Sequence, residues 1–225
     1  MLFEDRRDAG RKLAEAMVGL RELKDAVALG LARGGVPVAF EVAHAFRWPL
    51  DVYVVRKIGA PGQRELALGA IASGGVVVLN LDIVKTLEIS RDALRAVIER
   101  ETIELERQER EYREGRPPVE MEGRTAILID DGVATGASMR AAARAMRTVA
   151  SRVMIAVPVA ATHTCRDLEQ EADGVICLDR PLDFEAVGMF YRNFKATSDE
   201  EVRALLAQAR QEREAELAGR RGVEG

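Results

Sequence analysis

The stretch TAILIDDGVATGASMRAAARAM, residues 125–146, contains the pattern that decides the fold. Four consecutive apolar residues, Ala126 to Ile129, predict a short buried strand. Two carboxylates, Asp130 and Asp131, follow it directly, and a turn with glycine and hydroxyl residues comes next. The alanine-rich segment after that turn predicts a helix over 137–149. Strand, turn and helix in this order are the repeating unit of an α/β fold.

The rest of the chain repeats this alternation. Apolar and β-branched runs predict further strands, and amphipathic or capped segments predict further helices. The expected strands lie within 26–35, which ends in a glycine turn, at 50–55, at 76–80, at 153–157 and at 174–178. Residues 57–75 are expected to form a glycine-rich loop and then a short strand, and the expected helices lie at 4–23, 36–46, 90–113 and 199–214. We therefore expect an α/β fold with an open, mainly parallel, twisted sheet and helices on both faces.

Composition narrows the classes of function. The chain has 225 residues without internal repeats or a low-complexity linker, so we expect a single domain over residues 1–225. A net charge of −4 does not favour nucleic-acid binding. No apolar run is long enough for a membrane span, and the charged N-terminus does not resemble a signal peptide. With only two cysteines, at 165 and 177, we expect reduced thiols and a cytoplasmic protein.

The turn after the acidic pair has the features of a phosphate site. In a parallel α/β sheet, ligands bind beyond the carboxyl ends of the strands. Backbone N–H groups between Gly132 and Ser138 have no intrahelical acceptor, and the helix dipole adds positive potential at this point. Thr135 and Ser138 offer hydroxyl donors, and Gly136 lets an anion approach the backbone closely.

The two carboxylates indicate what else the ligand carries. Ionised carboxylates only accept hydrogen bonds, whereas the 2′- and 3′-hydroxyls of ribose donate them. A divalent cation such as Mg²⁺ would relieve the remaining repulsion between carboxylates and phosphate. The stretch therefore favours a ribose 5-phosphate site. No lysine follows Gly136 as a Walker A loop requires, and the dinucleotide and nucleophile-elbow glycine patterns are absent from this turn. An ordinary strand-to-helix turn is the alternative.

This stretch resembles the phosphoribosyl pyrophosphate (PRPP) motif of type I phosphoribosyltransferases. The motif is four apolar residues, two acidic residues and a loop ending T-G-[GA]-[ST]. The matching residues are Ile127, Leu128, Ile129, Asp130, Asp131, Thr135, Gly136, Ala137 and Ser138. Two residues depart from it: Gly132, where the family commonly has an apolar residue, and Ala134, where a threonine is common. The backbone of Ala134 can still contribute to the phosphate site.

Two further segments take on roles through this resemblance. Arg33, Gly34 and Gly35 look like the family's pyrophosphate loop, which in relatives carries a strained or cis peptide, here expected near Ala32–Arg33. Arg56 and Lys57 look like the start of the mobile loop that closes over the pyrophosphate in adenine and orotate members. The alternative for the first segment is an ordinary strand-to-helix turn, and the alternative for the second is a solvated turn.

The resemblance also implies a small hood that recognises the acceptor. Its candidates are residues 1–25 and 180–197, with 199–214 as a closing C-terminal helix. Val187 and Gly188 could present backbone groups to the acceptor. The aromatic residues of this segment could stack on a base or could instead form the edge of the core.

The implied activity is a Mg²⁺-dependent transfer of the 5-phosphoribosyl group from PRPP to a nucleobase or another small acceptor, with release of pyrophosphate. Asp130, Asp131, Arg56 and Lys57 are the predicted catalytic residues, and Asp131 is a candidate proton acceptor. No protein side chain is predicted as a metal ligand, and the resemblance implies a homodimer. The alternatives are a non-catalytic regulatory protein that binds PRPP or a nucleotide, and a phosphate-ester hydrolase.

Overall fold

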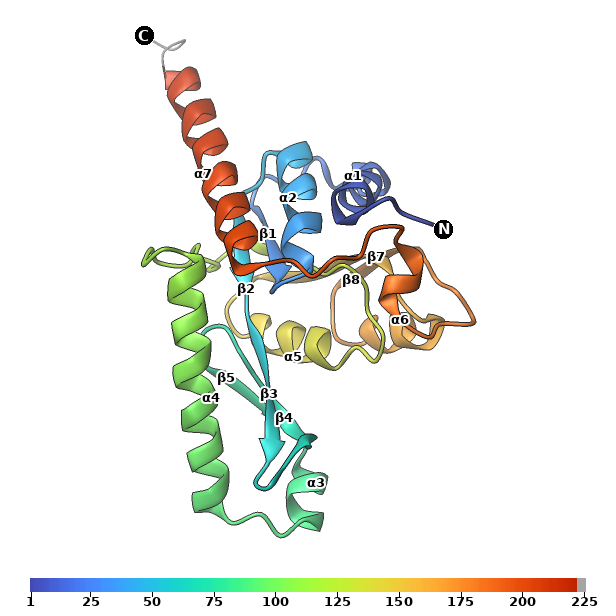
Figure 1. Cartoon of the computed structure of the whole chain (residues 1–225). Coiled ribbons are helices and arrows are strands. Elements are labelled where there is room, and N and C mark those ends of the chain that lie inside the picture. The colour runs from blue at the N-terminus through green and yellow to red at the C-terminus, as the bar shows by residue number, and fades with distance from the viewer. Residues whose placement is uncertain (222–225) are drawn as a thin grey trace.

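The computed structural model describes residues 1–221, apart from the side chains of residues 64, 65, 220 and 221. Its central sheet has five parallel strands in the order β2-β1-β6-β7-β8 (Figure 1). The strands are β1 (Ala26–Leu31), β2 (Leu50–Tyr53), β6 (Thr125–Ile129), β7 (Arg152–Val159) and β8 (Gly174–Asp179). All residues of β1 and β6 are buried, as expected for strands covered on both faces.

Helices cover both faces of this sheet, so the predicted fold class is confirmed. The helices α1 (Arg6–Ala16) and α2 (Gly35–Phe46) lie on one face, and α5 (Ala137–Met146) and α6 (Thr162–Leu168) lie on the other (Figure 1). The long helix α7 (Asp199–Arg221) packs against α2 and β2. Two short 3₁₀ helices lie in the connections: Val18–Leu20 between α1 and β1, and Val187–Phe190 between β8 and α7.

The strand order reverses direction between β1 and β6. From β1 the chain moves to β2 on one side of the sheet, and it later returns to β6 on the other side. Such a switch point leaves a crevice beyond the carboxyl ends of the two central strands. Gly30 is in register with Ile129, so the segments that begin at Ala32 and Asp130 leave the sheet side by side.

A second, antiparallel sheet extends away from the central one (Figure 1). It consists of β3 (Val55–Ala60), β4 (Gln63–Ala72) and β5 (Val76–Leu79), and the helices α3 (Leu81–Thr86) and α4 (Arg91–Tyr112) follow it. The side chains of Ile58, Leu68 and Leu105 are fully buried in the core that this sheet shares with α4. Ser90 caps α4 as predicted, because its Oγ accepts a hydrogen bond from the N–H of Ala93 at 3.2 Å.

The two segments predicted to form a hood meet in the structure. The N–H of Phe3 donates to the carbonyl of Phe190 at 2.8 Å, and the N–H of Arg192 donates to the carbonyl of Phe3 at 2.8 Å. The rings of Phe3 and Tyr191 lie 5.3 Å apart between centroids. These contacts place the N-terminus and residues 187–194 together beside the end of β6.

The sequence interpretation was wrong in several places. Residues 57–75 form most of the β3–β4 hairpin and not a loop followed by a short strand. The helices α3 and α6 were not predicted, and α1 is shorter than the expected 4–23. The highly charged second half of α4 also buries two residues, Leu105 and Tyr112.

Across residues 1–221, the model contains no helix whose length and apolarity would allow it to span a bilayer.

Candidate functional site

The loops after β1 and β6 are in direct contact at the switch point. A Cβ atom on Gly34 would lie 2.7 Å from the Cγ of Asp131, and one on Gly35 would lie 2.9 Å from the Cα of Asp130. Real Cβ atoms do not approach other atoms so closely. The two glycines therefore allow the predicted pyrophosphate loop to touch the acidic pair, and the predicted residues Gly34, Gly35, Asp130 and Asp131 form one site.

Arg33 directly precedes the two glycines in this loop. The peptide bond between Ala32 and Arg33 is cis, as the resemblance implied. The guanidinium of Arg33 is half-exposed, and its Nη1 lies 3.7 Å from Oδ1 of Asp199. Arg33, Arg56 and Lys57 all line one cavity of about 630 Å³, so the structure brings the three predicted basic residues together.

Arg56 and Lys57 lie within a strand, which corrects their predicted position at the start of a mobile loop. In β3 they pair with Ile71 and Ala70 of β4. Arg56 Nη2 donates to Oε2 of Glu101 at 2.7 Å. Burial opposes ionisation of Glu101, but hydrogen bonds from Arg56 and Arg100 hold the pKa of its carboxyl below the usual value. The tip of this hairpin is the turn at 61–62.

The surroundings of the acidic pair raise the pKa values of both carboxyl groups. Oδ1 of Asp130 accepts a hydrogen bond from the N–H of Asp131 at 2.9 Å. Burial and the neighbouring Asp131 carboxylate raise the pKa of Asp130 well above its usual range. Burial also raises the pKa of Asp131, although the positive charge of Arg6 opposes this shift. The pair therefore binds protons more readily than free aspartates do.

Arg6 is a residue of this site that the sequence interpretation missed. Its Nε donates to Oδ2 of Asp131 at 2.7 Å, and its Nη1 donates to the carbonyl of Lys195 at 2.6 Å. Its guanidinium carbon lies 4.0 Å from the ring centroid of Phe194. Arg6 thereby connects both hood segments to the acidic pair. Nothing local in the sequence could show this, because 125 positions separate Arg6 from Asp131.

The turn before α5 has the conformation expected of a phosphate site. Gly136 adopts a φ of 75°, and Ala134, Thr135, Ala137 and Ser138 around it are exposed. The hydroxyl of Thr164 holds the turn by donating to the carbonyl of Ala134 at 2.6 Å.

Arg140 adds a positive charge beside this turn that the sequence interpretation did not foresee. Its Nη1 donates to the carbonyl of Thr135 at 2.9 Å. The sequence does contain an indication of this contact. Arg140 lies one turn into α5, and a helical side chain covers the turn on the N-terminal side of its own Cα.

The hood reaches the acidic pair through Val187, Gly188 and Tyr191. The hydroxyl of Tyr191 donates to the carbonyl of Asp131 at 2.5 Å. A Cβ on Gly132 would lie 2.5 Å from Cγ1 of Val187, so the hood explains why glycine replaces the apolar residue common at this position. The carbonyl of Gly188 accepts from the N–H of Tyr191 at 3.2 Å, so within the hood this carbonyl already has a donor.

The model of the phosphoribosyl transferase domain matches residues 57–193, which is more than half of the chain. This chain belongs to that family. Besides the two acidic residues and the predicted phosphate turn, the matched range includes most of the second sheet and the predicted hood segment around Val187.

Individual relatives agree with this assignment to the phosphoribosyl transferase family. A Mycobacterium tuberculosis protein, named provisionally as a phosphoribosyl transferase, is 48% identical over 209 residues. The match covers 92% of this chain but 47% of that protein, so the chain spans about half the length of the curated relatives it matches. The crystal structure of the protein TT1426 from Thermus thermophilus is 44% identical, with a TM-score of 0.81, and the match covers 92% of this chain and 99% of that one.

Proposed function

We propose that this phosphoribosyl transferase domain transfers the 5-phosphoribosyl group of PRPP to a small acceptor, a nucleobase or a molecule of similar size, and releases pyrophosphate. The observation that carries the proposal is the contact between the Gly34–Gly35 loop and the pair Asp130–Asp131 at the switch point. In this proposal, one ligand spans the predicted pyrophosphate loop, the two carboxylates and the predicted phosphate turn before α5.

The proposed reaction is a substitution at C1 of the ribose. The nucleophilic atom of the acceptor forms a bond to C1 while the bond between C1 and the pyrophosphate oxygen breaks. The bonding electron pair leaves with pyrophosphate, and the acceptor gives up its proton. Such a reaction requires orientation and stabilisation of charge more than covalent help from the protein.

Each group of the site has a role in this step. The N–H groups before α5 hold the 5-phosphate, and the carboxylates accept hydrogen bonds from the ribose hydroxyls. Arg33, Arg56 and Lys57 stabilise the negative charge of the departing pyrophosphate. The sequence pointed to Asp131 as the proton acceptor, but its Oδ2 accepts from Arg6, so we assign that role to Asp130, whose raised pKa suits it.

The donor groups of the site fit a Mg²⁺ ion that is held mainly by ligand oxygens and water. Across residues 1–221, the described side chains include no group of three or more carboxylates, imidazoles or thiols arranged to hold a metal. Oδ2 of Asp131 is already taken by Arg6. When bound, Mg²⁺ would neutralise charge on the pyrophosphate. Removing it with a chelator should abolish turnover and leave the circular dichroism spectrum unchanged.

An assay of pyrophosphate release tests the proposal. The protein is incubated with PRPP, Mg²⁺ and a panel of nucleobases, and we expect release with at least one acceptor. Asp130→Asn with Asp131→Asn should weaken PRPP binding about tenfold or more, since it removes charge-assisted hydrogen bonds to the diol. Asp92→Asn, an exposed acidic residue at the start of α4, is the matched control and should bind as the wild type does.

The outcomes separate the competing functions. PRPP binding without pyrophosphate release from any acceptor would favour the regulatory alternative. Equal PRPP affinity in the double variant and the wild type would contradict the assignment of the two carboxylates. The homodimer and the cytoplasmic location stay predictions from the sequence, and sedimentation analysis tests the first of them.

A further inference from the structure

A second cavity, of about 310 Å³, lies at the opposite end of the central sheet from the site described above. Leu50 at the start of β2 and Arg124 just before β6 line it, so it lies at the amino ends of these parallel strands. Helix α7 and the segment that follows α4 form its other walls. Its lining is rich in arginine: Arg113, Arg116, Arg124, Arg210 and Arg213.

Arg113 and Asp51, the carboxylate in the cavity lining, form an ion pair. Arg113 Nε donates to both oxygens of Asp51, at 2.9 and 3.2 Å, and Asp51 also accepts from the N–H of Val119 at 3.0 Å. Arg113 is further paired with Glu109 at 3.1 Å. Both side chains of the Arg113–Asp51 pair are buried, so this pair is part of the cavity wall.

The other four arginines are poorly neutralised. Arg210 lies 3.7 Å from Glu114, beyond hydrogen-bond distance. Arg116, Arg124 and Arg213 form no ion pair with any residue in the described part of the chain. Burial and the positive charge of Arg124 lower the pKa of Arg213, and the negative charge of Glu216 only partly opposes this. Glu114 and Glu216 therefore offset the positive charge of this cluster only in part.

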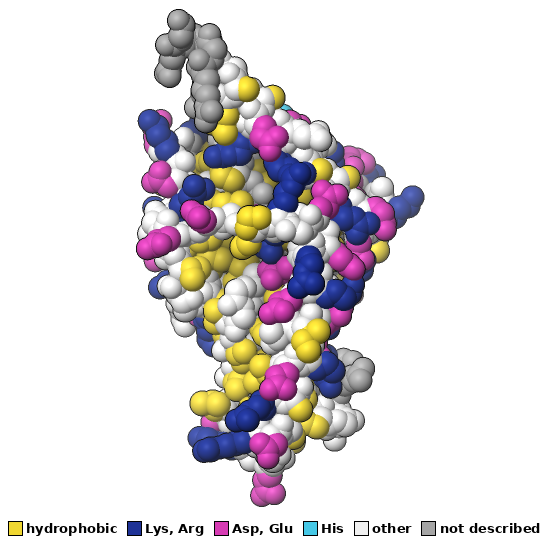
Figure 2. Space-filling model, turned by 90° about the vertical axis from the view of Figure 1, so that its left-hand side faces the viewer, with side chains coloured by type: hydrophobic (Ala, Val, Ile, Leu, Met, Phe, Trp, Pro, Cys, Tyr) yellow, Lys and Arg dark blue, Asp and Glu magenta, His cyan; other side chains and the backbone are white. Residues whose placement is uncertain are grey.

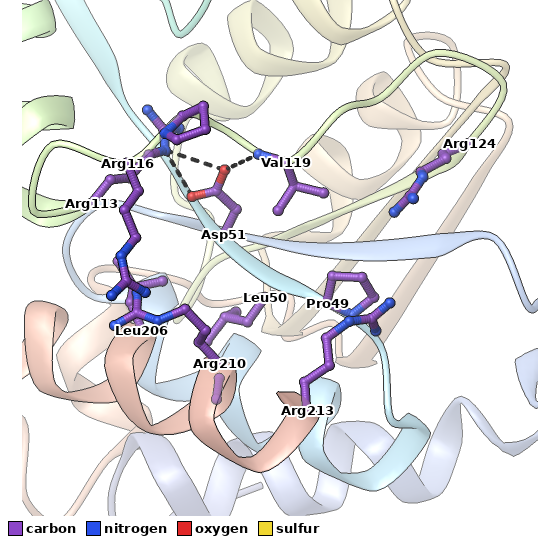
Figure 3. Close-up of a pocket in the computed structure, with 12 residues that line it drawn as sticks. Pro49, Leu50, Asp51, Arg113, Arg116, Val119, Arg124, Leu206, Arg210 and Arg213 are labelled. Carbon is purple, nitrogen blue, oxygen red and sulfur yellow. Dashed lines mark hydrogen bonds and ion pairs between the residues drawn. The ribbon is translucent and has the colours of Figure 1, made fainter. Parts of the chain in front are cut away.

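The arginines that line the cavity come from separate segments of the chain. In the view of Figure 3, Arg116 and Arg210 lie on the side of Arg113 and Leu206, whereas Arg213, which extends from α7 past Pro49, and Arg124 lie on the other side. Figure 2 shows the face that carries α4 and α7, where hydrophobic side chains lie exposed among Lys, Arg, Asp and Glu side chains. The cavity therefore combines an apolar floor, which includes Leu50 and Leu206, with a basic rim.

We infer that this arginine pocket is a second ligand site, which binds a small phosphorylated molecule with two or more phosphoryl charges. Guanidinium groups match phosphate oxygens in geometry and charge, and arginines from three separate chain segments can surround one such group. The volume is at the lower end of the range for small-molecule sites. The apolar floor suits the organic part of such a ligand.

Isothermal titration calorimetry on the full chain tests this inference. The probes are inorganic phosphate, pyrophosphate, ADP and, as a non-phosphate dianion, sulfate. We expect pyrophosphate or ADP to bind, and Arg210→Gln with Arg213→Gln to weaken that binding about tenfold or more. The matched control Arg203→Gln changes an arginine of the same helix that pairs with Glu200 outside the pocket, and it should change affinity less than about twofold.

The design separates this site from the proposed transferase site. Binding of the pocket ligand should persist in Arg33→Gln, which removes a charge assigned to pyrophosphate at the transferase site and leaves the lining of the arginine pocket unchanged. Tighter binding of ADP than of pyrophosphate would identify a nucleotide, and equal binding would identify the phosphoryl groups as the recognised part. Equal affinity in the Arg210/Arg213 variant and the wild type, or binding of sulfate as tight as that of ADP, would overturn the inference.

A folding control accompanies the variants. Arg210→Gln with Arg213→Gln removes like charges that repel, so its melting temperature should equal or exceed that of the wild type. If that variant does not fold, Arg116→Gln with Arg124→Gln tests the same pocket from the opposite wall. A wild type that binds no phosphate probe but loses self-association in these variants would show an interface between copies and would refute a small-molecule site.

Discussion

Asp130 is placed where its negative charge is costly. It lies between a buried strand and Asp131, and the N–H of Asp131 is the one backbone donor to its carboxyl among the described contacts. A ligand that donates hydrogen bonds or brings a cation would relieve this cost only while it is bound. The electrostatics of the residue therefore favour binding of a diol or a metal-bound anion over stability of the free protein.

The raised pKa of Asp130 predicts how stability depends on pH. A carboxyl whose folded-state pKa lies above its unfolded value destabilises the protein increasingly as pH rises above the unfolded value, and the full cost is reached once pH has passed the folded-state pKa. Asp130→Asn should therefore increase the free energy of unfolding at pH 7. The gain should vanish below the ordinary value of 3.8, where the wild-type carboxyl is protonated in both states. Urea denaturation at several pH values measures it, and a gain that is independent of pH would contradict this account.

Individual residues differ in how far sequence could place them. Asp130, Asp131, Gly136 and Ser138 belong to one continuous motif, and local chemistry alone assigned them to a phosphate and diol site. Arg6 could not be assigned, because its partners Asp131 and Lys195 lie far along the chain. Only the packing of α1 against the hood reveals it.

At the scale of elements, the turn into α5 depends on one backbone conformation. Gly136 has a φ of 75°, and a Cβ there would lie 2.9 Å from both Nη1 of Arg140 and Cγ2 of Thr164. Non-glycine residues seldom adopt this conformation. The geometry of the phosphate turn therefore relies on glycine at this position.

Gly136→Ala should accordingly harm both binding and stability. We expect a loss of about 1–3 kcal/mol in the free energy of unfolding from the strained conformation, and weaker PRPP binding because the N–H groups are displaced. Gly219→Ala in α7 is the control, because a Cβ there meets nothing within 4 Å and alanine favours a helix. Denaturant titration and calorimetry measure the two effects, and equal behaviour of the two variants would contradict the role given to Gly136.

Elements were predictable where periodicity and capping agreed. The strands β1 and β6 and the start of α4 followed from apolar runs and from the Ser90 cap. The β3–β4 hairpin was missed because the segment ALGAIASGG is rich in alanine and glycine, which have low strand propensity. Its strand structure comes from pairing with β3 and β5, which is a tertiary effect.

The whole molecule consists of a central sheet that holds the acidic pair and a second sheet that holds Arg56 and Lys57. Lys57 lines the cavity with Arg33, and it also lines a cavity between the second sheet and α5 that includes Ala137 and Ser138. The geometry of the proposed site therefore depends on how firmly the second sheet and α4 are attached to the central sheet. A sequence could indicate that both parts exist but not how they are joined.

The buried ion pair between Arg113 and Asp51 connects the segment at the end of α4 to the central sheet. Removing it tests whether this attachment stabilises the protein. Arg113 ends α4, and Asp51 lies in β2 of the central sheet. Arg113→Leu leaves the carboxylate of Asp51 buried without its cation, which should cost about 3–5 kcal/mol of the free energy of unfolding. Arg107→Leu, which removes exposed ion pairs from the same helix, should leave that free energy nearly unchanged.

A second variant separates the buried charge from lost packing. Arg113→Leu with Asp51→Leu removes both charges, so it should recover most of the stability lost in the single variant. Urea denaturation measures all three proteins. If the double variant is as unstable as Arg113→Leu, packing and not the unpaired carboxylate determines the loss. If neither variant is destabilised, the pair does not join the two parts of the molecule, and the attachment must come from the apolar core between α4, β2 and β3.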